Sequence, residues 1–224
     1  MKNAKVNAQT IYESLKEMIT CFDVRPGSRI TETQVSEYFD VSRTPVRAAL
    51  QRLEVEGFLN IRPKQGCFIR NIDLVTINNY YDVRLELESM VLRLISEGKN
   101  DQELIDLSND WHPEQLNYGL EITDALKAAE EAFHVELSEL SGNNVLVNYL
   151  RDISDKIRVV RRMGFPDENS VLFTYDDHYR ICQLLLHKDL QQAIDEMKNH
   201  IRKSQDTANN VSLKQIYGKK SVFE

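Results

Sequence analysis

Glycine, proline and cysteine are scarce in this chain of 224 residues, which has 8 Gly, 5 Pro and 3 Cys. So few helix-breaking residues favour helix and exclude a collagen-like chain, and a hydrophobic content of 42% excludes a disordered one. The cysteines form no Cys-x-x-Cys pair, and their odd number fits reduced thiols rather than a disulfide framework. No apolar run reaches the length of a membrane helix, about 18 residues, and residues 1–5 are polar. We therefore expect a cytoplasmic protein with no membrane segment.

Charge is unevenly distributed along the chain. The whole chain carries a formal charge of -7, which by itself argues against a nucleic-acid partner. Residues 1–73, however, contain 11 Lys and Arg against 9 Asp and Glu, a formal charge of +2, whereas residues 74–224 carry -9. At the same point the pattern changes from short helices and β-rich runs to long helices. We expect two domains, 1–73 and 74–224.

The first domain begins with three short helical patterns. Residues 8–20 place apolar side chains at the spacing of an amphipathic helix. Thr31 followed by Gln34 predicts a capping box that starts a second helix. Ser42 is the expected N-cap of a third helix, which ends at Gly57. The second and third helices, joined by a tight turn, are typical of a helix-turn-helix.

A β-hairpin with a basic tip follows these helices. Residues 58–62 and 67–70 alternate like strands on either side of a Pro-Lys-Gln-Gly turn. Together these elements predict a winged helix-turn-helix. The expected fold class is mainly α, with this α+β domain followed by an all-α antiparallel helical bundle.

The start of the third helix and the wing tip carry the candidate DNA contacts. These are Ser42, Arg43, Thr44, Arg47, Lys64 and Gln65. Guanidinium groups at a helix start can reach guanine edges, while hydroxyls and free helix N–H groups hold phosphates. The alternative is that the arginines are merely solvated and the module mediates protein contacts. Helix, turn, helix and wing occur in the order of a DNA-binding module, which favours DNA binding.

Three histidines of the second domain lie in apolar surroundings. A predicted helix over residues 124–140 places Glu130 and His134 one turn apart at the edge of its apolar stripe. His178 lies within the stripe of a later helix, and His200 lies on the last one. The turn between these two helices falls near residues 188–189, about eleven residues from each histidine. In an antiparallel hairpin both lie roughly 16 Å from the turn, so they can face each other.

One carboxylate and three imidazoles inside a helical bundle suit a divalent metal such as Zn²⁺, Ni²⁺ or Mn²⁺. Glu130, His134, His178 and His200 are therefore the candidate metal ligands. The alternative is that each histidine is hydrogen-bonded in the core. Cys182, one turn from His178, is expected to be a core residue, although a thiolate ligand remains an alternative.

An arginine near the start of the second domain is a candidate effector ligand. Arg84 and Glu88 share a helical stripe with apolar residues, which is unusual for charged side chains. An inward Arg84 could bind a carboxylate effector. A surface ion pair between Arg84 and Glu88 explains the pattern equally well.

The first domain resembles the N-terminal domain of GntR-family transcription regulators over residues 8–70. The resemblance rests on PGSRITE at 26–32, VSRTPVRAALQRLEVEGF at 41–58 and GCFI at 66–69. It implies DNA contacts by Arg43, Thr44, Arg47 and the wing around Lys64, Gln65 and Gly66. Thr33 departs from the pattern, because some members have arginine there.

The second domain resembles the FCD effector domain of the FadR-type subgroup. The resemblance rests on Phe133-His134, SGN at 141–143, the apolar setting of His178 and MKNHI at 197–201. It implies a metal site of one aspartate and three histidines, at the positions of the four candidate ligands, with Glu130 in place of aspartate. It also implies a small carboxylic acid as effector, bound beside or on the metal.

These observations predict a transcription regulator that binds an inverted-repeat operator as a homodimer and responds to an effector. A metal-free regulator whose pocket depends on Arg84 is an alternative. A metalloenzyme is disfavoured, because the chain has no His-Glu-x-x-His and a single Glu-x-x-His, from Glu131 to His134.

Overall fold

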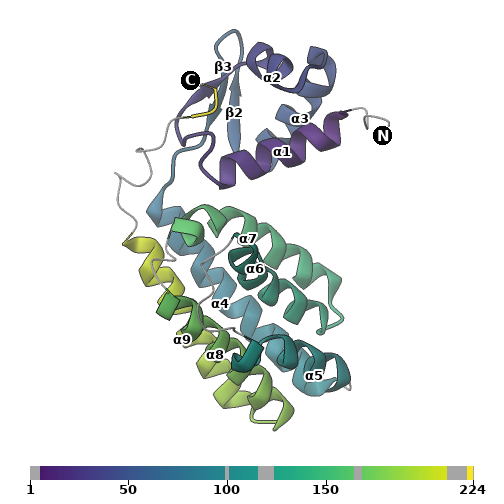
Figure 1. Ribbon diagram of the computed structural model, residues 1–224, viewed down its shortest axis with the longest axis vertical. Helices are drawn as coiled ribbons and strands as arrows, with labels where there is room; N and C mark the ends of the chain where they lie inside the picture. Colours follow the sequence, from purple (N-terminus) through teal and green to yellow (C-terminus); the bar gives the residue numbers. More distant parts are fainter. Residues whose placement is uncertain (1–5, 99–100, 116–123, 164–167, 211–220, 224) are drawn as a thin grey trace. The chain divides into compact units, whose positions relative to one another are not determined.

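The computed structural model describes residues 6–98, 101–115, 124–163, 168–210 and 221–223 (Figure 1). The chain divides into two compact units: unit 1 is Met1–Asp73 with Ser212–Glu224, and unit 2 is Leu74–Val211. The predicted fold class is confirmed, since a three-stranded sheet accompanies the first helices and the described residues of unit 2 are helical. None of the helices in the described part of the chain has the length and apolarity needed to cross a membrane.

Three helices of unit 1 surround its core. They are α1 (Ala8–Thr20), α2 (Glu32–Phe39) and α3 (Arg43–Val55). The predicted capping box is present: the Gln34 backbone donates to Thr31 Oγ1 (3.2 Å) and the Thr31 backbone donates to Gln34 Oε1 (2.9 Å). Leu15, Leu50 and Leu53 are fully buried where these helices meet. Local signals therefore start the helices, and apolar burial packs them.

A small antiparallel sheet completes the winged helix-turn-helix. It consists of β1 (Arg29–Ile30), β2 (Leu59–Arg62) and β3 (Gly66–Ile69), in the order β1-β3-β2. The hairpin of β2 and β3 is the predicted wing. β1 was not predicted, because two residues are too few to show an alternating pattern. Residues 29–30 form a strand because they pair with β3: Arg29 pairs with Phe68, and Ile30 pairs with Cys67.

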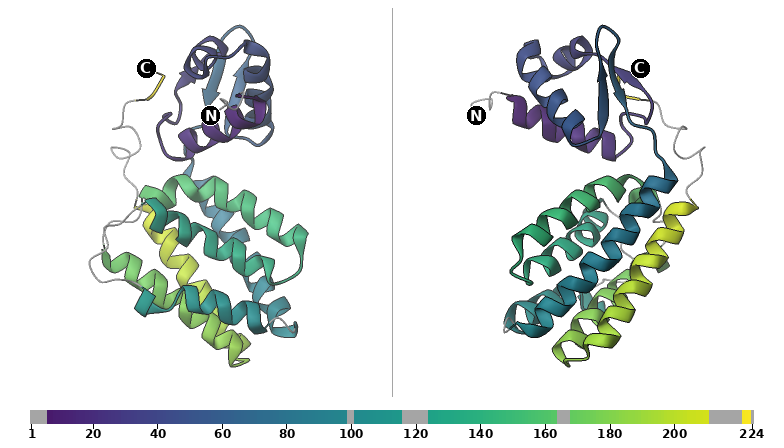
Figure 2. Two further views of the ribbon diagram at one scale, coloured as in Figure 1. Left: turned by 45° about the vertical axis from the view of Figure 1, so that its right-hand side comes forward. Right: turned by 180° about the vertical axis from the view of Figure 1, so that it is seen from behind.

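The C-terminal segment differs from the predicted domain division. From the sequence, all of residues 74–224 were expected in the second domain, whereas the described residues 221–223 belong to unit 1. The described residues 221–223 lie against the rest of unit 1 (Figure 2). The Phe223 ring packs against the core of that unit. The sequence did not predict this packing, because the partners of the Phe223 ring are far away in the sequence. A contact of a single apolar side chain produces no periodic pattern.

Unit 2 is built from six α-helices in its described part. They are α4 (Leu74–Glu97), α5 (Asp101–Asp110), α6 (Asp124–Glu139), α7 (Asn144–Met163), α8 (Glu168–Leu186) and α9 (Leu190–Asn209), with a short 3-10 turn, η1 (Pro113–Gln115). Long helices α4 and α9 lie side by side (Figure 2), and α4 also packs against α7. Asp189 caps α9 by accepting a hydrogen bond from the Gln192 backbone (3.3 Å). This arrangement leaves α6, α8 and α9 to supply side chains to one interior region.

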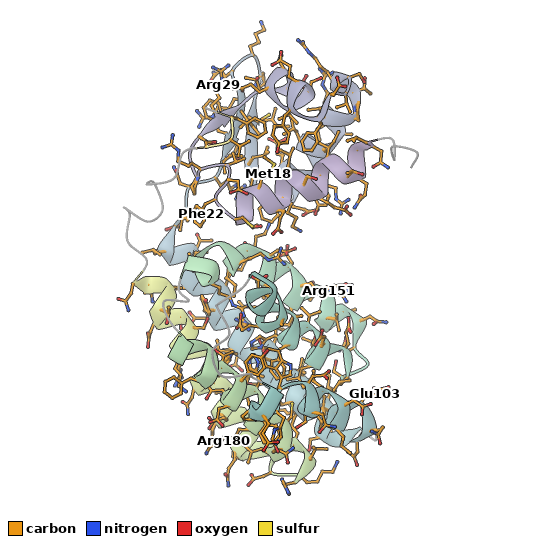
Figure 3. All side chains as sticks on the ribbon, in the orientation of Figure 1. Met18, Phe22, Arg29, Glu103, Arg151 and Arg180 are labelled. Carbon is orange, nitrogen blue, oxygen red and sulfur yellow. The ribbon has the colours of Figure 1, made fainter. Side chains whose placement is uncertain are left out.

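Charged side chains separate into two groups in unit 2. Arg151, Glu103 and Arg180 lie on its outside (Figure 3). A second group is buried and includes Arg84 (1% exposed) and Glu88 (1% exposed). Because buried charges are costly unless they are paired, this second group marks a specialised site.

Candidate DNA interface and metal centre

The start of α3 presents polar groups at the surface of unit 1. Ser42, Arg43 and Thr44 are exposed there. Ser42 is the N-cap residue, but its side chain makes no capping hydrogen bond, so its hydroxyl does not occupy the helix N–H groups. A helix start with free N–H groups and nearby hydroxyls is suited to a phosphate oxygen. Arg43 is the first residue of this helix, and its long cationic side chain can reach a base edge.

Arg47 is oriented by a carboxylate on the neighbouring helix. Its Nε and Nη2 atoms donate to Glu32 Oε1 and Oε2, each at 2.9 Å, in a two-point contact. The hydrogen bonds from Arg47 lower the pKa of Glu32, so this carboxylate stays ionised. Arg47 was predicted from the sequence as a DNA contact, whereas Glu32 was not, although it lies at the start of α2 within the PGSRITE stretch. The contact leaves Arg47 exposed and holds its guanidinium in one orientation.

The wing tip is a tight turn with exposed polar residues. Lys64 (φ 62°) and Gly66 (φ 110°) both have backbone conformations with positive φ. The Gln65 backbone N–H donates a hydrogen bond to the Arg62 carbonyl oxygen (3.0 Å). A Cβ at Gly66 would lie 3.0 Å from the Ile30 carbonyl oxygen, so glycine is needed for the close approach of β1. Lys64 and Gln65 are exposed at the end of this hairpin. Gly66 therefore shapes the tip, and its two neighbours provide the polar groups.

The four candidate metal ligands come together inside unit 2. Glu130 and His134 come from α6, His178 from α8 and His200 from α9, and one ligand atom of each lies within 4.8 Å of the others. All four residues are buried, with exposed fractions between 0% for His178 and 6% for His200. His178 Nε2 and His200 Nε2 face each other at 3.3 Å. The antiparallel pairing of α8 and α9 thus brings these two histidines to one level.

Two of the imidazoles are hydrogen-bonded to carboxylates through their Nδ1 atoms. His134 Nδ1 lies 2.6 Å from Glu88 Oε2, and His200 Nδ1 lies 3.2 Å from Asp177 Oδ2. A carboxylate accepts, so each Nδ1 carries the proton and each Nε2 presents a lone pair to the interior. This is how proteins orient histidines that bind metals. From the sequence, Glu88 was expected only as a partner of Arg84, and Asp177 was not predicted, although it lies next to His178.

The third imidazole is positioned by aromatic rings. Phe133 stacks on His178 with ring centroids 3.7 Å apart, and Trp111 meets it edge to face at 4.4 Å. Burial lowers the pKa of His178 and of His134 well below the ordinary histidine range, and nearby cationic groups add to this effect. Both rings are therefore neutral, which is the state that binds a metal ion.

The donor set fits a divalent cation. Glu130 Oε2 and His134 Nε2 are buried and have no hydrogen-bond partner among the described residues. Buried polar atoms are normally satisfied, so two unsatisfied atoms in one cluster of potential ligands fit a bound cation. Three imidazole nitrogens and one carboxylate oxygen are ligand types that Zn²⁺, Ni²⁺ and Mn²⁺ accept in proteins.

Arg161 is a buried residue of α7 that the sequence did not single out as part of the site. It is 4% exposed and forms an ion pair with Glu130 through Nη2 and Oε1. Although burial alone would lower it, the carboxylate of Glu130 raises the pKa of Arg161. The overlooked signal was periodicity, since Arg161 follows the buried residues Ile157 and Leu150 on one face of α7. Arg161 therefore orients Glu130 through this ion pair.

Arg84 points inward and is paired at the same time. Its Nε donates to Glu88 Oε1 (2.5 Å), while Nη2 has no hydrogen-bond partner among the described residues. The surface ion pair considered from sequence is therefore wrong, because both side chains are buried. Glu88 also contacts His134, so Arg84 belongs to the surroundings of the metal ligands.

The remaining alternatives lose support from the geometry. Cys182 is fully buried, and burial raises the pKa of its thiol to about 12, which disfavours a thiolate ligand. Glu131, the first residue of the Glu-x-x-His pattern, forms an ion pair with Arg158 (2.9 Å between Oε2 and Nε). It is not one of the four clustered ligands.

Comparison with known proteins identifies both parts of the chain. Residues 7–69 match the family described as bacterial regulatory proteins, gntR family, and residues 79–203 match the FCD domain. The chain is 33% identical over 189 residues to the Nta operon transcriptional regulator of Aminobacter aminovorans, covering 84% of this chain and 88% of that protein. It is 23% identical over 203 residues to the HTH-type transcriptional repressor RspR of Escherichia coli K12, covering 91% and 89%.

A solved structure shows the same fold. A transcriptional regulator of the GntR type from Rhodococcus sp. RHA1 superposes with a TM-score of 0.72 at 18% identity, covering 92% of this chain and 98% of that one. The relatives are transcriptional regulators and not enzymes, as predicted. The chain belongs to the GntR family and is a DNA-binding transcriptional regulator with an FCD effector-binding domain.

Proposed function

We propose that this regulator changes its affinity for an operator when a small carboxylic acid binds at a metal centre formed by Glu130, His134, His178 and His200. The observation that supports it is the convergence of these four buried ligand atoms within 4.8 Å. The ion, Zn²⁺, Ni²⁺ or Mn²⁺, would supply a Lewis-acidic partner for a carboxylate oxygen. Glu88, Asp177 and Arg161 would hold the ligands in place, as their hydrogen bonds indicate.

The charge balance of the site supports an anionic effector. Arg84 and Arg161 are matched by Glu88 and Glu130, and the buried imidazoles of His134 and His178 are neutral. A divalent cation added to this balanced set leaves an excess of positive charge in a buried place, which an anion would offset.

Unused donors also support a carboxylate ligand. Arg84 Nη2 and Arg161 Nε and Nη1 are buried N–H groups without a partner among the described residues. Guanidinium N–H groups are well matched to carboxylate oxygens. We therefore assign Arg84 to effector binding, together with Arg161.

A thermal-shift screen of organic acids tests this function. With Zn²⁺ present, we expect an acid such as lactate, malate or citrate, at about 100 times its dissociation constant, to stabilise the protein by about 2.7 kcal/mol. With the metal removed by a chelator, we expect that stabilisation to be lost. Equal stabilisation with and without chelator would instead support the metal-free pocket built on Arg84. No stabilisation by any acid, with metal bound, would contradict the proposed effector class.

The DNA-binding surface is proposed to be the start of α3 together with the wing tip. Its residues are Ser42, Arg43, Thr44, Arg47, Lys64, Gln65 and Gly66. The exposure of Arg43 and Thr44 at a helix start supports this assignment, as does the orientation of Arg47 by Glu32. Because the protein acts on DNA, we place it in the cytoplasm.

A homodimer is supported by a second apolar stripe on α4. The stripe consists of Tyr80, Val83, Leu87, Met90 and Leu94. Its spacing alternates between three and four residues, the pattern by which two helices pair. Val83 is 52% exposed and Met90 is 43% exposed, although the opposite side of α4 is buried in the bundle. A second copy of the chain is the proposed occupant of this stripe.

The stripe is self-complementary in an antiparallel pairing. With Leu87 opposite its own copy, Tyr80 lies opposite Leu94, and Val83 lies within one residue of Met90 of the other chain. Exposed Asp82 likewise lies within one residue of exposed Arg93. A two-fold axis at Leu87 therefore brings apolar side chains of the two copies together and places acidic side chains near basic ones. The same symmetry suits the two half-sites of an inverted-repeat operator.

Charge introduced into the stripe is expected to dissociate the dimer. In the double variant Val83→Glu, Met90→Glu, an unpaired buried charge costs about 3–5 kcal/mol, so the dimer dissociation constant should rise at least about 100-fold. Sedimentation velocity measures the change. Val145→Glu is the matched control, because Val145 is 65% exposed on α7, outside the stripe. A double variant that sediments as the wild-type dimer would exclude this interface.

A further inference from the structure

Two buried arginines beside the candidate metal ligands keep N–H groups that the described part of the chain does not use. Arg84 Nε donates to Glu88, whose other oxygen accepts from His134. Arg161 Nη2 donates to Glu130, which is itself a candidate ligand. Arg84 Nη2 and Arg161 Nε and Nη1 are buried without a hydrogen-bond partner among the described residues. Because an unsatisfied buried donor is costly, these atoms indicate where a ligand binds.

The unused donors outnumber the acceptor sites of a single carboxylate. Each terminal nitrogen of a guanidinium carries two hydrogens and Nε carries one. The three unpartnered atoms of Arg84 and Arg161 therefore present five N–H groups. A carboxylate offers about four lone-pair sites, and one oxygen bound to a metal ion leaves about three of them. One carboxylate thus leaves about two N–H groups unsatisfied, whereas a second carboxylate supplies enough acceptors.

The two arginines lie on helices that pack together, and a neighbouring hydroxyl pair is already satisfied. Arg84 is on α4 and Arg161 is on α7, and these helices contact each other. Tyr81, which is fully buried one turn before Arg84, has its hydroxyl 3.1 Å from Ser204 Oγ on α9. One ligand can therefore reach both guanidinium groups, and the described residues do not take its place.

The charge that a metal ion adds also matches two carboxylates. Arg84 and Arg161 are already paired with Glu88 and Glu130. A divalent ion therefore brings two positive charges that these buried pairs do not offset. Because unpaired charge is costly to bury, a dianion fits the loaded site better than a monoanion does.

We propose that the effector is a dicarboxylic acid, with one carboxylate on the metal ion and the second bound by Arg84 and Arg161. This inference rests on the proposed function and narrows its effector from small carboxylic acids to those with two acid groups. An acid without the second carboxylate leaves buried N–H groups unsatisfied, which is how a polar site rejects an analogue that lacks one group.

Matched pairs of acids test the proposal by isothermal titration calorimetry on the full chain loaded with Zn²⁺. The dicarboxylates are malonate, succinate, glutarate and adipate. Each is compared with the monocarboxylate of equal carbon number: propionate, butyrate, pentanoate or hexanoate. We expect the best dicarboxylate to bind at least about tenfold more tightly than its matched acid, because hydrogen bonds between charged groups are among the strongest in proteins.

Two lysine variants test which residues bind the second carboxylate. Arg84→Lys and Arg161→Lys keep the positive charge beside Glu88 and Glu130 but remove the forked N–H groups. Each variant should reduce the preference for the best dicarboxylate over its matched acid at least about fivefold. Arg180→Lys is the matched control, because Arg180 is exposed on α8, and it should keep the full preference.

The outcomes separate this proposal from the function on which it rests. Equal affinity within every matched pair, with binding lost on chelation, would overturn the dicarboxylate and leave the metal-centred function standing. No binding of any of the eight acids would overturn both. A preference for dicarboxylates that both lysine variants retain in full would overturn the assignment to Arg84 and Arg161.

Discussion

His178→Ala is expected to abolish stoichiometric metal binding. The wild-type chain, purified and incubated with Zn²⁺, should hold about one ion per chain. The variant should bind the metal at least about 100-fold more weakly. Loss of a residue that hydrogen-bonds to a metal ligand weakens metal binding about 10–100-fold, and we expect loss of the ligand itself to weaken it more. The residue is fully buried beside three other ligand atoms, and no surface side chain can replace its nitrogen. Elemental analysis and competition with a coloured chelator measure the effect.

Two further variants make this result interpretable. His187→Ala is the matched control, since His187 is exposed at the end of α8 and its Nδ1 lies 2.7 Å from the Gln183 carbonyl of its own helix. Asp177→Asn keeps every ligand but replaces the carboxylate behind His200, and it should weaken metal binding about 10–100-fold. Stoichiometric metal surviving both His178→Ala and His200→Ala would refute the site.

The pH dependence of metal binding has a defined direction. Protons compete with a metal for imidazole nitrogens, so affinity falls as the pH drops through the histidine pKa. Burial lowers the pKa of His134 and His178. Their competition with protons therefore begins at lower pH than for an exposed histidine, and binding should persist through mildly acidic conditions.

Arg43→Ala is expected to weaken operator binding and to relax base preference at one position. A guanidinium that contacts a guanine edge contributes about 1–3 kcal/mol of discrimination, so the affinity for a sequence selected from a random DNA pool should fall roughly 5–150-fold. Lys64→Ala at the wing tip should instead weaken all DNA similarly and reduce the salt slope by about one. Fluorescence anisotropy at several salt concentrations measures both effects.

The controls for this prediction separate DNA contact from general charge. Arg151→Ala removes one exposed arginine from unit 2, where it pairs with Glu139, and should leave DNA affinity unchanged. If Arg43→Ala bound the selected operator as tightly as the wild type, α3 would lose its assigned role.

Elements with local causes could be predicted from the sequence. The first helix, the capping box of Thr31 and Gln34, and the wing hairpin depend on side-chain periodicity, a cap and turn residues within a few positions of one another. The pairing of His178 with His200 could also be anticipated, because a short turn between two helices determines which residues lie opposite.

Other features depend on contacts far apart in sequence. β1 has its structure because β3 pairs with it, and Phe223 packs on unit 1 because α2 offers a ring and an amide there. Arg161 lies on the buried stripe of α7, where its charge is not expected from the sequence alone. An arginine is buried only where a carboxylate such as Glu130 can pair with it, and that partner is 31 residues away.

The sequence by itself determined the class of this protein: a mainly helical regulator with an N-terminal DNA-binding module and a second domain whose histidines recur on inward helix faces. Only the tertiary structure decided how the site is completed. It brought Glu88 behind His134, Asp177 behind His200 and Arg161 onto Glu130. The physical reason is that helix periodicity specifies which face is buried, whereas the partner of a buried charge depends on which helices pack together.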